Sequence, residues 1–370
     1  MTARHPEIAL YLPSLRGGGA ERVMMLLANG FAKRGYAVDL VLATAEGPYL
    51  KDIDANVRLV DLKARRVATS LPALVRYLRR ERPAALLAAM GHANVIAVLA
   101  RCLASVPRRV VVSERNNFSI SKAHARNWRG RFVDQLMRWA YPRADGVIAI
   151  SGGVADDLGE TISLPESSID VVYNPLVTSR LIARGKEAPE HPWLQPGHPP
   201  VILGIGRLTM QKDFPTLIHA FSRLRKERNA RLLILGEGEL RPELEKLVAD
   251  LELDSDVMMP GFTDNPFVFM RQASLFVLSS AWEGFGNVLV EAMACGTPVV
   301  STDCPSGPAE VLENGKWGRL VPVGDVDALA KAMAEALDEK NHPDVAARAA
   351  EFSVDRAVAG YLRVMLGGES

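Results

Sequence analysis

The stretch Ile8-Ala9-Leu10-Tyr11-Leu12-Pro13-Ser14-Leu15-Arg16-Gly17-Gly18-Gly19, near the start of the chain, decides the fold. Its first residues, Ile8–Leu12, are apolar and predict a buried strand. The glycines then form a turn, after which Ala20–Arg34 places apolar side chains on one helical face until Gly35 ends the helix. A strand, a glycine-rich turn and a helix in this order form the repeating unit of parallel α/β sheets.

The same alternation of apolar runs and helical stretches continues along the chain, which predicts an α/β fold class with parallel sheets. The pattern dissolves between Asn174 and Pro200, where six prolines and several charges are typical of a linker. A second series of strands and helices begins at Val201. We therefore expect two Rossmann-like domains, residues 1–175 and 201–342, joined by a linker at 176–200 and followed by helical residues at 343–370.

The composition is typical of a folded globular protein in a reducing compartment. The chain has 370 residues, of which 48% are hydrophobic and 24% charged, the balance of a folded globular protein rather than a disordered, collagenous or coiled-coil one. Its three cysteines are widely spaced, which argues against a disulfide framework and fits a reducing compartment. The apolar run Ile8–Leu12 is too short for the core of a signal peptide, so we expect a cytoplasmic protein.

The uncharged segment Pro83–Ala100 has 18 residues and approaches the length of a membrane span. Its middle holds Gly91, His92 and Asn94, where hydrocarbon would penalise polar groups most. We therefore expect a buried strand at Ala84–Met90, then a loop, then a buried helix at Val95–Leu103.

Charge is distributed unevenly along a chain whose formal net charge is only +1. The segment from Arg58 to Arg143 holds 18 Lys and Arg against 4 Asp and Glu, a net charge of +14. Such segregation indicates an anionic partner, namely lipid headgroups, a phosphorylated acceptor or nucleic acid, unless it only forms a well-solvated surface. Nucleic acid is the least expected partner, because the segment lacks a groove-reading motif.

Aromatic residues alternate with these basic residues between Lys122 and Arg143. A helix there would carry an aromatic stripe of Trp128, Phe132, Leu136 and Trp139 beside the cations Arg126, Arg129 and Arg131. Such a stripe usually faces the core of a domain, but a basic helix rich in Trp can instead lie on a membrane surface.

Two stretches of the second series carry residues that suit phosphates and sugar hydroxyls. After the strand Val201–Ile205, Arg207 and Lys212 can bind a diphosphate, although two surface charges would look the same. After a later strand, Glu283 lies in a loop whose glycines open backbone amides, and Glu291 lies one turn into the next helix. Ligands of open α/β sheets bind at this edge. The simpler interpretations are a helix-surface position for Glu291 and a capping role for Glu283.

Together, the seven residues between Glu283 and Glu291, the stretch Gly206-Arg207-Leu208-x₃-Lys212 and the turn Gly18-Gly19-Ala20-Glu21 resemble retaining glycosyltransferases of family 4, which have the GT-B fold. The segments Gly18–Val23, Ser113–Asn116 and Tyr141-Pro142 further resemble bacterial transferases that extend polyprenyl-diphosphate-linked glycans. This resemblance covers nearly the whole chain. It implies two Rossmann-like domains facing across a cleft, with the last helix, around Val354–Leu366, passing back to the first domain.

The resemblance implies a role for each candidate residue. Arg207 and Lys212 would neutralise the leaving diphosphate, and Glu291 would hold the ribose hydroxyls of the nucleotide. Glu283 and His92 would contact the donor sugar. Further contacts with the nucleotide-sugar would come from Gly18, Gly19, Phe285, Gly286, Asn287, Val288 and Leu289, and the acceptor would meet Glu114 and Arg115.

Taken without the resemblance, several of these residues have simpler interpretations. A single histidine in an apolar segment, such as His92, is more often a satisfied core residue. The glycine turn is equally an ordinary tight turn, and Glu114 with Arg115 an ordinary surface pair.

We therefore expect a retaining glycosyltransferase that moves a sugar from a nucleotide-sugar, a UDP-hexose or UDP-N-acetylhexosamine by family habit, to a lipid-linked glycan. It would work at the inner face of the cytoplasmic membrane, with the basic segment 58–143 attracted to anionic lipid. The alternatives are a transferase with a soluble acceptor, a nucleotide-sugar epimerase, and a regulatory protein that binds a nucleotide-sugar without catalysis.

No cofactor and no metal are expected. Pairs of Asp with the Asp-x-Asp spacing that can hold a metal occur at positions 52/54, 254/256 and 325/327, and we interpret them as structural. Arg207 and Lys212 already supply the positive charge that a divalent ion would bring to the leaving group.

Overall fold

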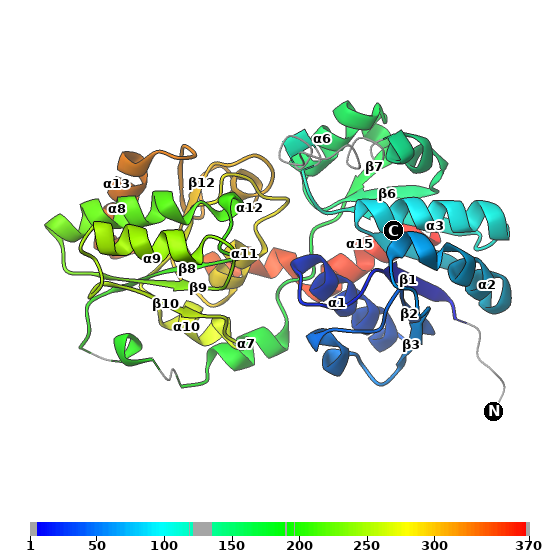
Figure 1. Ribbon diagram of the computed structural model, residues 1–370, viewed down its shortest axis with the longest axis horizontal. Coiled ribbons are helices and arrows are strands. Elements are labelled where there is room, and N and C mark those ends of the chain that lie inside the picture. The colour runs from blue at the N-terminus through cyan, green and yellow to red at the C-terminus, as the bar shows by residue number, and fades with distance from the viewer. Residues whose placement is uncertain (1–5, 118, 121–134, 189–190, 196, 368–370) are drawn as a thin grey trace. The chain divides into compact units, whose positions relative to one another are not determined.

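The computed structural model of the protein describes residues 6–117, 119–120, 135–188, 191–195 and 197–367. These residues form two compact units (Figure 1). Unit 1 extends to Pro175 and resumes at Val354, and unit 2 spans Leu176–Ser353. The chain therefore passes between the units twice, after Pro175 and after Ser353.

Unit 1 is built on a seven-stranded sheet in which neighbouring strands are parallel. The strand order is β3-β2-β1-β4-β5-β6-β7. The strands are β1 (Ile8–Leu12), β2 (Val38–Leu42), β3 (Val57–Asp61), β4 (Ala85–Ala89), β5 (Arg109–Glu114), β6 (Gly146–Ala149) and β7 (Ile169–Val171). Strands β1 and β4 are buried along their whole length, which explains why each is a continuous apolar run in the sequence.

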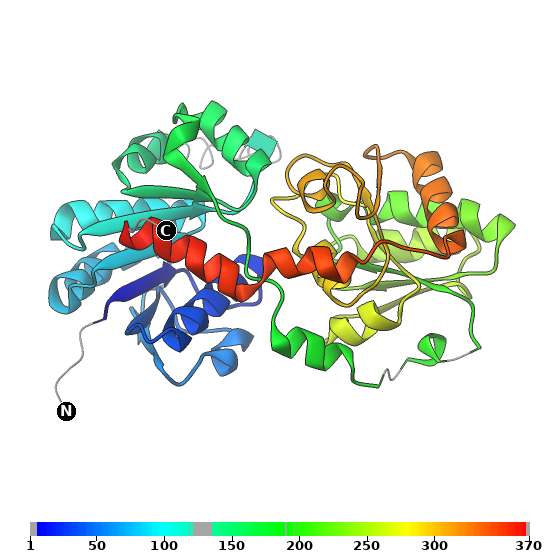
Figure 2. The ribbon, with the colours of Figure 1, turned by 180° about the vertical axis from the view of Figure 1, so that it is seen from behind.

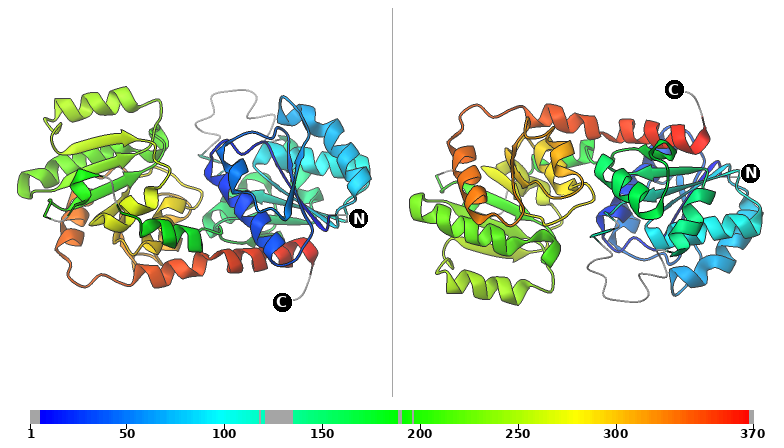
Figure 3. Two further views of the ribbon diagram at one scale, coloured as in Figure 1. Left: turned by 90° about the horizontal axis from the view of Figure 1, so that it is seen from below. Right: turned by 90° about the horizontal axis from the view of Figure 1, so that it is seen from above.

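Helices cover both faces of this sheet (Figure 3). They include α1 (Gly19–Lys33), α2 (Leu71–Glu81), α3 (Gly91–Ala104), α6 (Gly152–Ile162) and α15 (Val354–Leu366). The last of them, α15, packs against α1 and β5 (Figure 2). A Cβ on Gly30 of α1 would lie 2.4 Å from Cγ2 of Val358, and one on Gly146 of β6 would lie 2.8 Å from Cγ1 of Val364. Glycine at both positions is therefore what lets α15 approach so closely.

Unit 2 is built on a six-stranded parallel sheet of order β10-β9-β8-β11-β12-β13. The strands are β8 (Val201–Ile205), β9 (Arg231–Leu235), β10 (Val257–Gly261), β11 (Leu275–Leu278), β12 (Val299–Thr302) and β13 (Arg319–Val321). The helices are α7 (Ser179–Gly185), α8 (Phe214–Glu227), α9 (Arg241–Asp250), α10 (Pro266–Gln272), α11 (Asn287–Ala294), α12 (Pro308–Val311), α13 (Val326–Asp338) and α14 (Val345–Ala349). The core of unit 2 includes Phe221, Ile234, Leu275 and Met333, all fully buried. The expected α/β class with two Rossmann-like parallel sheets is confirmed.

The segment 176–200, expected to be a linker, differs from that expectation because it is part of unit 2. Its helix α7 packs against α10, and the side chains of Leu181 and Leu194 are buried. The prolines and charges of this segment therefore mark short secondary structure rather than a segment without packing.

The C-terminal residues 343–370, expected to be one helical segment, are divided between the units. Helix α14 and the turn at Ala350–Phe352 belong to unit 2, and α15 belongs to unit 1. The helix is interrupted because Ser353 has an extended backbone and forms an isolated parallel bridge with Val177. The amides of Leu176 and Val177 both donate to the carbonyl of Phe352, at 3.0 and 3.1 Å, and hold the two crossing segments together.

Candidate active site

The expected donor-binding residues of unit 2 meet where the sheet reverses its order. Strands are added outward from β8 through β9 to β10 on one side, and from β11 through β12 to β13 on the other. At such a switch point the loops after the two central strands diverge, and ligands bind at their carboxyl ends. Arg207 and Lys212 follow β8, and Glu283 follows β11. The topology therefore brings the three residues to the same point of one sheet edge.

The sheet of unit 1 has the same arrangement. Its switch point lies between β1 and β4. Gly18 and Gly19 follow β1, and His92 follows β4. Glu114 is the last residue of β5, the next strand along this edge.

A short hydrogen-bond cluster joins the two loops of unit 2. Lys212 Nζ lies 2.5 Å from Glu283 Oε1, and Ser280 Oγ donates to the same oxygen at 2.6 Å. Only 16% of the Lys212 side chain and 9% of the Glu283 side chain are exposed, so this ion pair is held largely out of water. Ser279 Oγ donates to the carbonyl of Lys212 at 2.8 Å, which fixes the lysine backbone as well.

A glycine makes room for the stem of Lys212. A Cβ on Gly206 would lie 2.9 to 3.0 Å from Cγ, Cδ and Cε of Lys212, so the lysine side chain passes directly over the Gly206 backbone. Arg207, the next residue, is exposed, and no residue that the structure describes forms a hydrogen bond or ion pair with its guanidinium. Unit 2 thus presents one lysine already bonded to a carboxylate and one arginine open to a ligand.

The loop that follows Glu283 turns into α11 through a left-handed glycine. Gly286 has φ +84° and is the N-cap of α11, so any other residue there would be strained. The backbone of Phe285 packs on Gly307, whose Cβ, if present, would lie 2.3 Å from the Phe285 carbonyl oxygen. Asn287 and Val288 are half-buried in the first turn of α11, whereas the side chain of Leu289 is fully buried. Leu289 is therefore a core residue, and only its backbone could contribute to a ligand site.

Glu291 lies in α11 with only 4% of the residue exposed. Burial first, and the Glu291 carboxylate second, raise the pKa of Cys295 to about 12. The structure therefore excludes the simpler interpretation of Glu291 as a helix-surface residue.

The glycine turn of unit 1 is closed by its own glutamate. The amides of Gly17 and Gly18 donate to Glu21 Oε2 at 2.8 and 2.6 Å, and Ser14 Oγ donates to Glu21 Oε1 at 3.3 Å. Glu21 is 8% exposed. The Gly18 amide, expected to approach a phosphate, is thus already satisfied inside the turn, and Gly19 is the exposed glycine at the start of α1.

His92 lies in the first turn of α3 rather than in the loop that the sequence predicted, because α3 begins at Gly91. The residue is solvent-exposed, so it is not the satisfied core histidine of the simpler interpretation. Desolvation by the surrounding protein lowers the pKa of His92 from its usual value, which favours a neutral imidazole at pH 7. The turn before it is strained, since Met90 has φ +80°.

Glu114 and Arg115, expected to face the acceptor or else to form an ordinary surface pair, are both buried, at 4% and 5% exposure, so they are not a surface pair. Arg115 donates to Asn174 Oδ1 at 2.9 Å and to the hydroxyl of Tyr361 at 3.0 Å. Asn174 directly precedes the first crossing of the chain, and Tyr361 belongs to α15. Arg115 therefore holds both crossing segments on unit 1.

Sequence reasoning gave no role to three residues that complete these arrangements, although two of them, Glu21 and Tyr141, stand in the motifs quoted above. They are Ser280, which shares the Glu283 oxygen with Lys212, Glu21, which closes the glycine turn, and Tyr141, whose hydroxyl donates to Glu114. Ser280 precedes Glu283 by three residues, but spacing alone does not predict a bond between two side chains in a loop.

The Asp-x-Asp pairs have structural partners. Asp325 caps α13 by accepting from the amide of Ala328 at 2.9 Å, as expected of a helix start. Asp256 pairs with Arg225 and Arg231. In the described ranges, no three His, Cys, Asp or Glu side chains are grouped so that they could hold a metal ion. That the reaction needs no metal stays a prediction.

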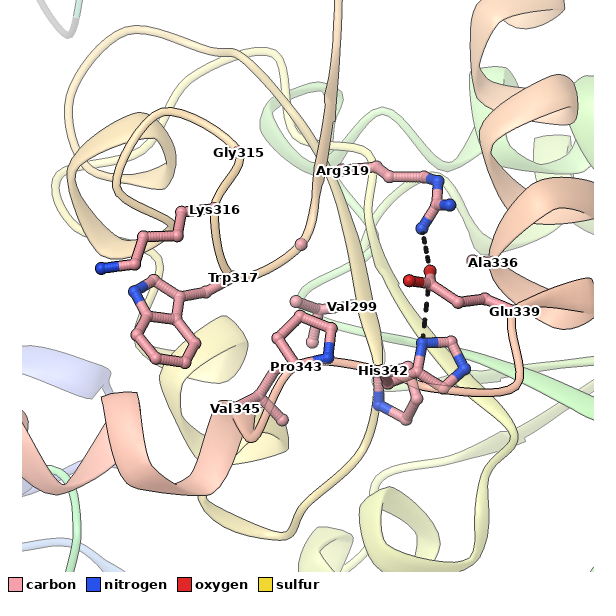
Figure 4. A pocket seen from close by; sticks show the side chains of 12 residues that line it. Val299, Gly315, Lys316, Trp317, Arg319, Ala336, Glu339, His342, Pro343 and Val345 are labelled. Carbon is pink, nitrogen blue, oxygen red and sulfur yellow. Dashed lines mark hydrogen bonds and ion pairs between the residues drawn. The ribbon is translucent and has the colours of Figure 1, made fainter.

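A cavity of about 350 Å³ lies elsewhere in unit 2 (Figure 4). Trp317, Arg319, Glu339 and His342 line it, and Glu339 accepts from Arg319 and pairs with His342 at 3.5 Å. Because Val299 and Arg319 are the first residues of β12 and β13, this cavity is at the amino ends of the strands. It therefore lies at the opposite sheet edge from Lys212 and Glu283.

The basic segment is only partly described. The stripe residues Trp128 and Phe132 and the cations Lys122, Arg126, Arg129 and Arg131 lie outside the described residues. In the described part, exposed basic residues are frequent along the chain from the end of β3 to the end of α2. They are Lys63, Arg65, Arg66, Arg76, Arg79, Arg80 and Arg82. Within the described ranges, no helix is both long and apolar enough to cross a bilayer.

Comparisons with known proteins place this chain in a family. A model described as Glycosyltransferase Family 4 matches residues 17–180, and a model described as Glycosyl transferases group 1 matches residues 186–352. The two matches meet near the junction of the two units and together cover most of the chain. The chain therefore belongs to the family 4 glycosyltransferases, with the GT-B fold.

Two curated relatives are similar over nearly their full length. One is the N-acetylgalactosamine-N,N'-diacetylbacillosaminyl-diphospho-undecaprenol 4-alpha-N-acetylgalactosaminyltransferase of Campylobacter jejuni, 28% identical over 355 residues and 90% of each chain. The other is the lipopolysaccharide core biosynthesis glycosyltransferase LpsE of Rhizobium meliloti, 29% identical over 95% of this chain and 96% of LpsE.

Solved structures agree on the fold. Anabaena HepE, crystallised with UDP and glucose, superposes with a TM-score of 0.78 at 21% identity over 97% of this chain and 99% of its own. WaaG, a glycosyltransferase involved in lipopolysaccharide biosynthesis, superposes with a TM-score of 0.72 at 17% identity over 98% of this chain and all of its own.

Proposed function

We propose that this glycosyltransferase moves a sugar, with retention of configuration, from a UDP-hexose or UDP-N-acetylhexosamine to a polyprenyl-diphosphate-linked glycan in bacterial glycan assembly. The binding of a nucleotide-sugar donor is supported by the Lys212–Glu283–Ser280 cluster at the switch point of unit 2. The exposed guanidinium of Arg207 follows the same strand as Lys212. The names of the Campylobacter and Rhizobium relatives support the acceptor class.

The leaving group is a nucleoside diphosphate, which gains negative charge as the bond to the sugar breaks. Arg207 and Lys212 would stabilise that charge, Arg207 directly and Lys212 by turning from Glu283 toward the phosphates. Glu291 would accept from the ribose hydroxyls. Glu283 and the amides of Phe285, Gly286 and Asn287 would hold the donor sugar. We propose a donor-sugar contact for His92 as well.

The bonds of Glu283 argue against a covalent sugar–enzyme intermediate. A double displacement needs one carboxylate free to attack the anomeric carbon and a second carboxyl about 5 Å away. Glu283 Oε1 instead accepts from Ser280, a bond that would stay in place when Lys212 turns toward the phosphates. We propose that the leaving phosphate takes the proton of the acceptor hydroxyl on the face from which it departs, so that the sugar keeps its configuration.

The described basic residues favour an acceptor that carries phosphate and lies at a membrane. Lys63, Arg65 and Arg66 follow β3, so they lie at the same sheet edge as the glycine turn and His92. Each basic residue near an anionic bilayer contributes about 1 kcal/mol of attraction. We propose peripheral attachment to the inner face of the cytoplasmic membrane.

Glu114 and Arg115 are not part of the proposed acceptor site, because both side chains have partners inside unit 1.

The proposal is tested by a donor panel. Purified protein is incubated with UDP-, GDP- and ADP-sugars, with and without a bacterial polyprenyl-diphosphate-glycan extract, and nucleoside diphosphate and glycan masses are measured. We expect extract-dependent UDP release and a lipid-linked glycan heavier by one sugar, unchanged by EDTA and lost in Lys212→Ala.

Other outcomes favour other functions. UDP release without extract would favour a soluble acceptor, and an isomerised sugar would favour an epimerase. Binding of a nucleotide-sugar without turnover under any condition would favour a regulatory protein.

A further inference from the structure

A chain of buried polar groups lies beneath the turn that carries His92. Asn94, two residues after His92 in α3, donates through Nδ2 to the hydroxyl of Tyr141 at 2.9 Å. Tyr141 in turn donates to Glu114 Oε2 at 2.7 Å. Asn94, Tyr141 and Glu114 are exposed by 0%, 1% and 4%, so the whole chain of hydrogen bonds is inside unit 1.

This network fixes the first turn of α3 to two other elements. Asn94 Nδ2 also donates to the carbonyl of Ser113 in β5, at 3.0 Å. Glu114 ends the same strand, and its Oε1 accepts from the amides of Arg115 and Asn116 at 3.0 and 3.4 Å. The start of α3 is thereby bonded to the end of β5 and to Tyr141 at once.

A buried carboxylate is a costly way to support a helix. Without enough donors, an ionised group in the interior costs several kcal/mol, whereas an apolar side chain of similar size would cost nothing of the kind. Such a network also gives a fixed geometry, because each hydrogen bond has a preferred distance and direction. A network of this kind therefore suits the fixed placement of the turn above it.

The turn above the network needs such support. Met90 has φ +80°, a conformation that is strained for a residue with a side chain. Gly91 is tightly enclosed, since a Cβ there would lie 3.1 Å from Met137 Sδ and 3.8 Å from Glu114 Oε2. His92 follows directly and is exposed. Strained backbone persists only where the surroundings hold it in place, and Glu114 and Met137 both lie against Gly91, the residue between Met90 and His92.

We propose that Glu114, Tyr141 and Asn94 are positioning residues that hold the Met90–His92 turn, so that His92 is presented in one orientation to the donor sugar. The proposal rests on the donor-sugar role proposed for His92. The three residues act through His92 and do not touch the substrate.

The first test needs no substrate. Protein labelled with ¹³C-histidine is titrated by NMR, and the His92 signal is assigned from its loss in His92→Ala. In Tyr141→Phe we expect the His92 titration midpoint to move upward toward the usual 6.5 and the signal to broaden. The matched control is Tyr77→Phe, because Tyr77 is also buried in unit 1 and donates to a carboxylate, that of Asp39. Tyr77→Phe should leave the His92 signal unchanged.

The second test is a double-mutant cycle on turnover, measured as UDP release from UDP-glucose and UDP-N-acetylglucosamine with the glycan extract. Tyr141→Phe should lower kcat about 10-fold with KM nearly unchanged, because small misplacements of a reacting group cost that much. In the His92→Ala background the same change should have no further effect, since the residues act as one unit. Glu114→Gln, whose amide oxygen still accepts from Tyr141, should keep more activity than Glu114→Leu.

The outcomes separate this inference from the proposed function. An unchanged His92 signal in folded Tyr141→Phe, or an equal change in Tyr77→Phe, overturns the positioning role whatever the activity. A His92 signal that moves as expected, with normal turnover in His92→Ala, keeps the positioning role and overturns the donor-sugar role of His92. Full additivity in the cycle shows that Tyr141 acts other than through His92.

Discussion

Phe352 packs edge-on against Phe285, with ring centroids 5.4 Å apart and ring planes at 71°. Phe285 belongs to the loop proposed to hold the donor sugar. Phe352 is in the segment that leaves unit 2, and its carbonyl accepts from the two residues with which the chain enters that unit. The place where the chain enters and leaves unit 2 is therefore in direct contact with the loop that would bind the donor.

Shortening Phe352 should loosen that loop. We expect Phe352→Leu to lower the free energy of unfolding by about 1–2 kcal/mol, since both rings are buried, and to weaken UDP binding about 3- to 10-fold. Calorimetric titration with UDP and urea unfolding measure the two effects. Phe221→Leu is the control, because Phe221 is equally buried but lies in α8. Equal loss of UDP affinity in both variants would contradict a specific link between Phe352 and the loop.

Arg207 and Lys212 should be equally important for turnover and unequal for stability. Either change to Ala should reduce kcat about 10²- to 10³-fold, as expected when a donor to a developing charge is lost. Arg207→Ala should leave the free energy of unfolding within about 0.5 kcal/mol, because the residue is exposed. Lys212→Ala should lower it by about 1–3 kcal/mol, because buried Glu283 loses its cation.

The control for both changes is Arg228→Ala. Arg228 pairs with Asp338 beyond the end of α8, at the opposite sheet edge from Lys212. Single-turnover rates and thermal unfolding of the three variants measure the effects on turnover and on stability. Near-normal turnover in both Arg207→Ala and Lys212→Ala would disprove a diphosphate-binding pair.

Replacing two glycines of the same region by alanine should affect different properties, turnover for Gly206 and stability for Gly236. In Gly206→Ala the new Cβ displaces only the flexible stem of Lys212, so we expect turnover to fall about 10-fold with Tm nearly unchanged. In Gly236→Ala the new Cβ would lie 2.0 Å from the carbonyl oxygen of Gly206, in a backbone with φ +135°. That variant should lose about 2 kcal/mol or more of stability. Thermal unfolding combined with UDP-release rates distinguishes the two, and a normal rate in Gly206→Ala would show that Lys212 need not lie over Gly206.

The two parallel sheets were predictable from sequence because fully buried parallel strands are continuous apolar runs. Ile8–Leu12 and Val201–Ile205 were predicted with the bounds that the structure has. Helix starts were less certain, and α3 begins at Gly91 although His92 and Asn94 suggested a loop. Asn94 is buried there because it bonds with Tyr141 and Ser113, and no local pattern in the sequence reports those partners.

The direction of individual charged side chains was not predictable for the same reason. An arginine just after a strand suggests a surface residue, yet Arg115 points inward to partners 59 and 246 positions along the chain. The Gly18-Gly19-Ala20-Glu21 turn suggested backbone amides that are free to bind a phosphate. In the structure the Gly18 amide donates to Glu21 instead. The spacing of residues does not specify the Glu21 rotamer that makes this bond possible. By contrast, Lys212 and Glu283 could be expected at one sheet edge, because each follows a strand and the carboxyl ends of parallel strands lie at the same edge.

Glu114 should make stability depend on pH in a definite direction. Burial raises the pKa of Glu114 above its ordinary value of 4.5, and the hydrogen bonds from Tyr141 and from two amides lower it only in part. A carboxyl whose pKa is higher in the folded than in the unfolded protein contributes stability below the unfolded pKa. That contribution is lost as the pH rises through the folded pKa. Deprotonation of Glu114 therefore opposes folding above pH 4.5.

Glu114→Gln removes this dependence while keeping an acceptor for Tyr141. We expect the difference in free energy of unfolding between Glu114→Gln and the unchanged protein to shift in favour of the variant as the pH rises from 4.5, by about 1.4 kcal/mol for each unit by which the pKa is raised. Urea unfolding at a series of pH values measures the difference. The control is Glu237→Gln, because that carboxyl is exposed, pairs with Arg241 and has a lowered pKa, so its difference should shift the opposite way or not at all. A flat difference for Glu114→Gln across this range would mean that the Glu114 carboxylate is fully compensated by its donors.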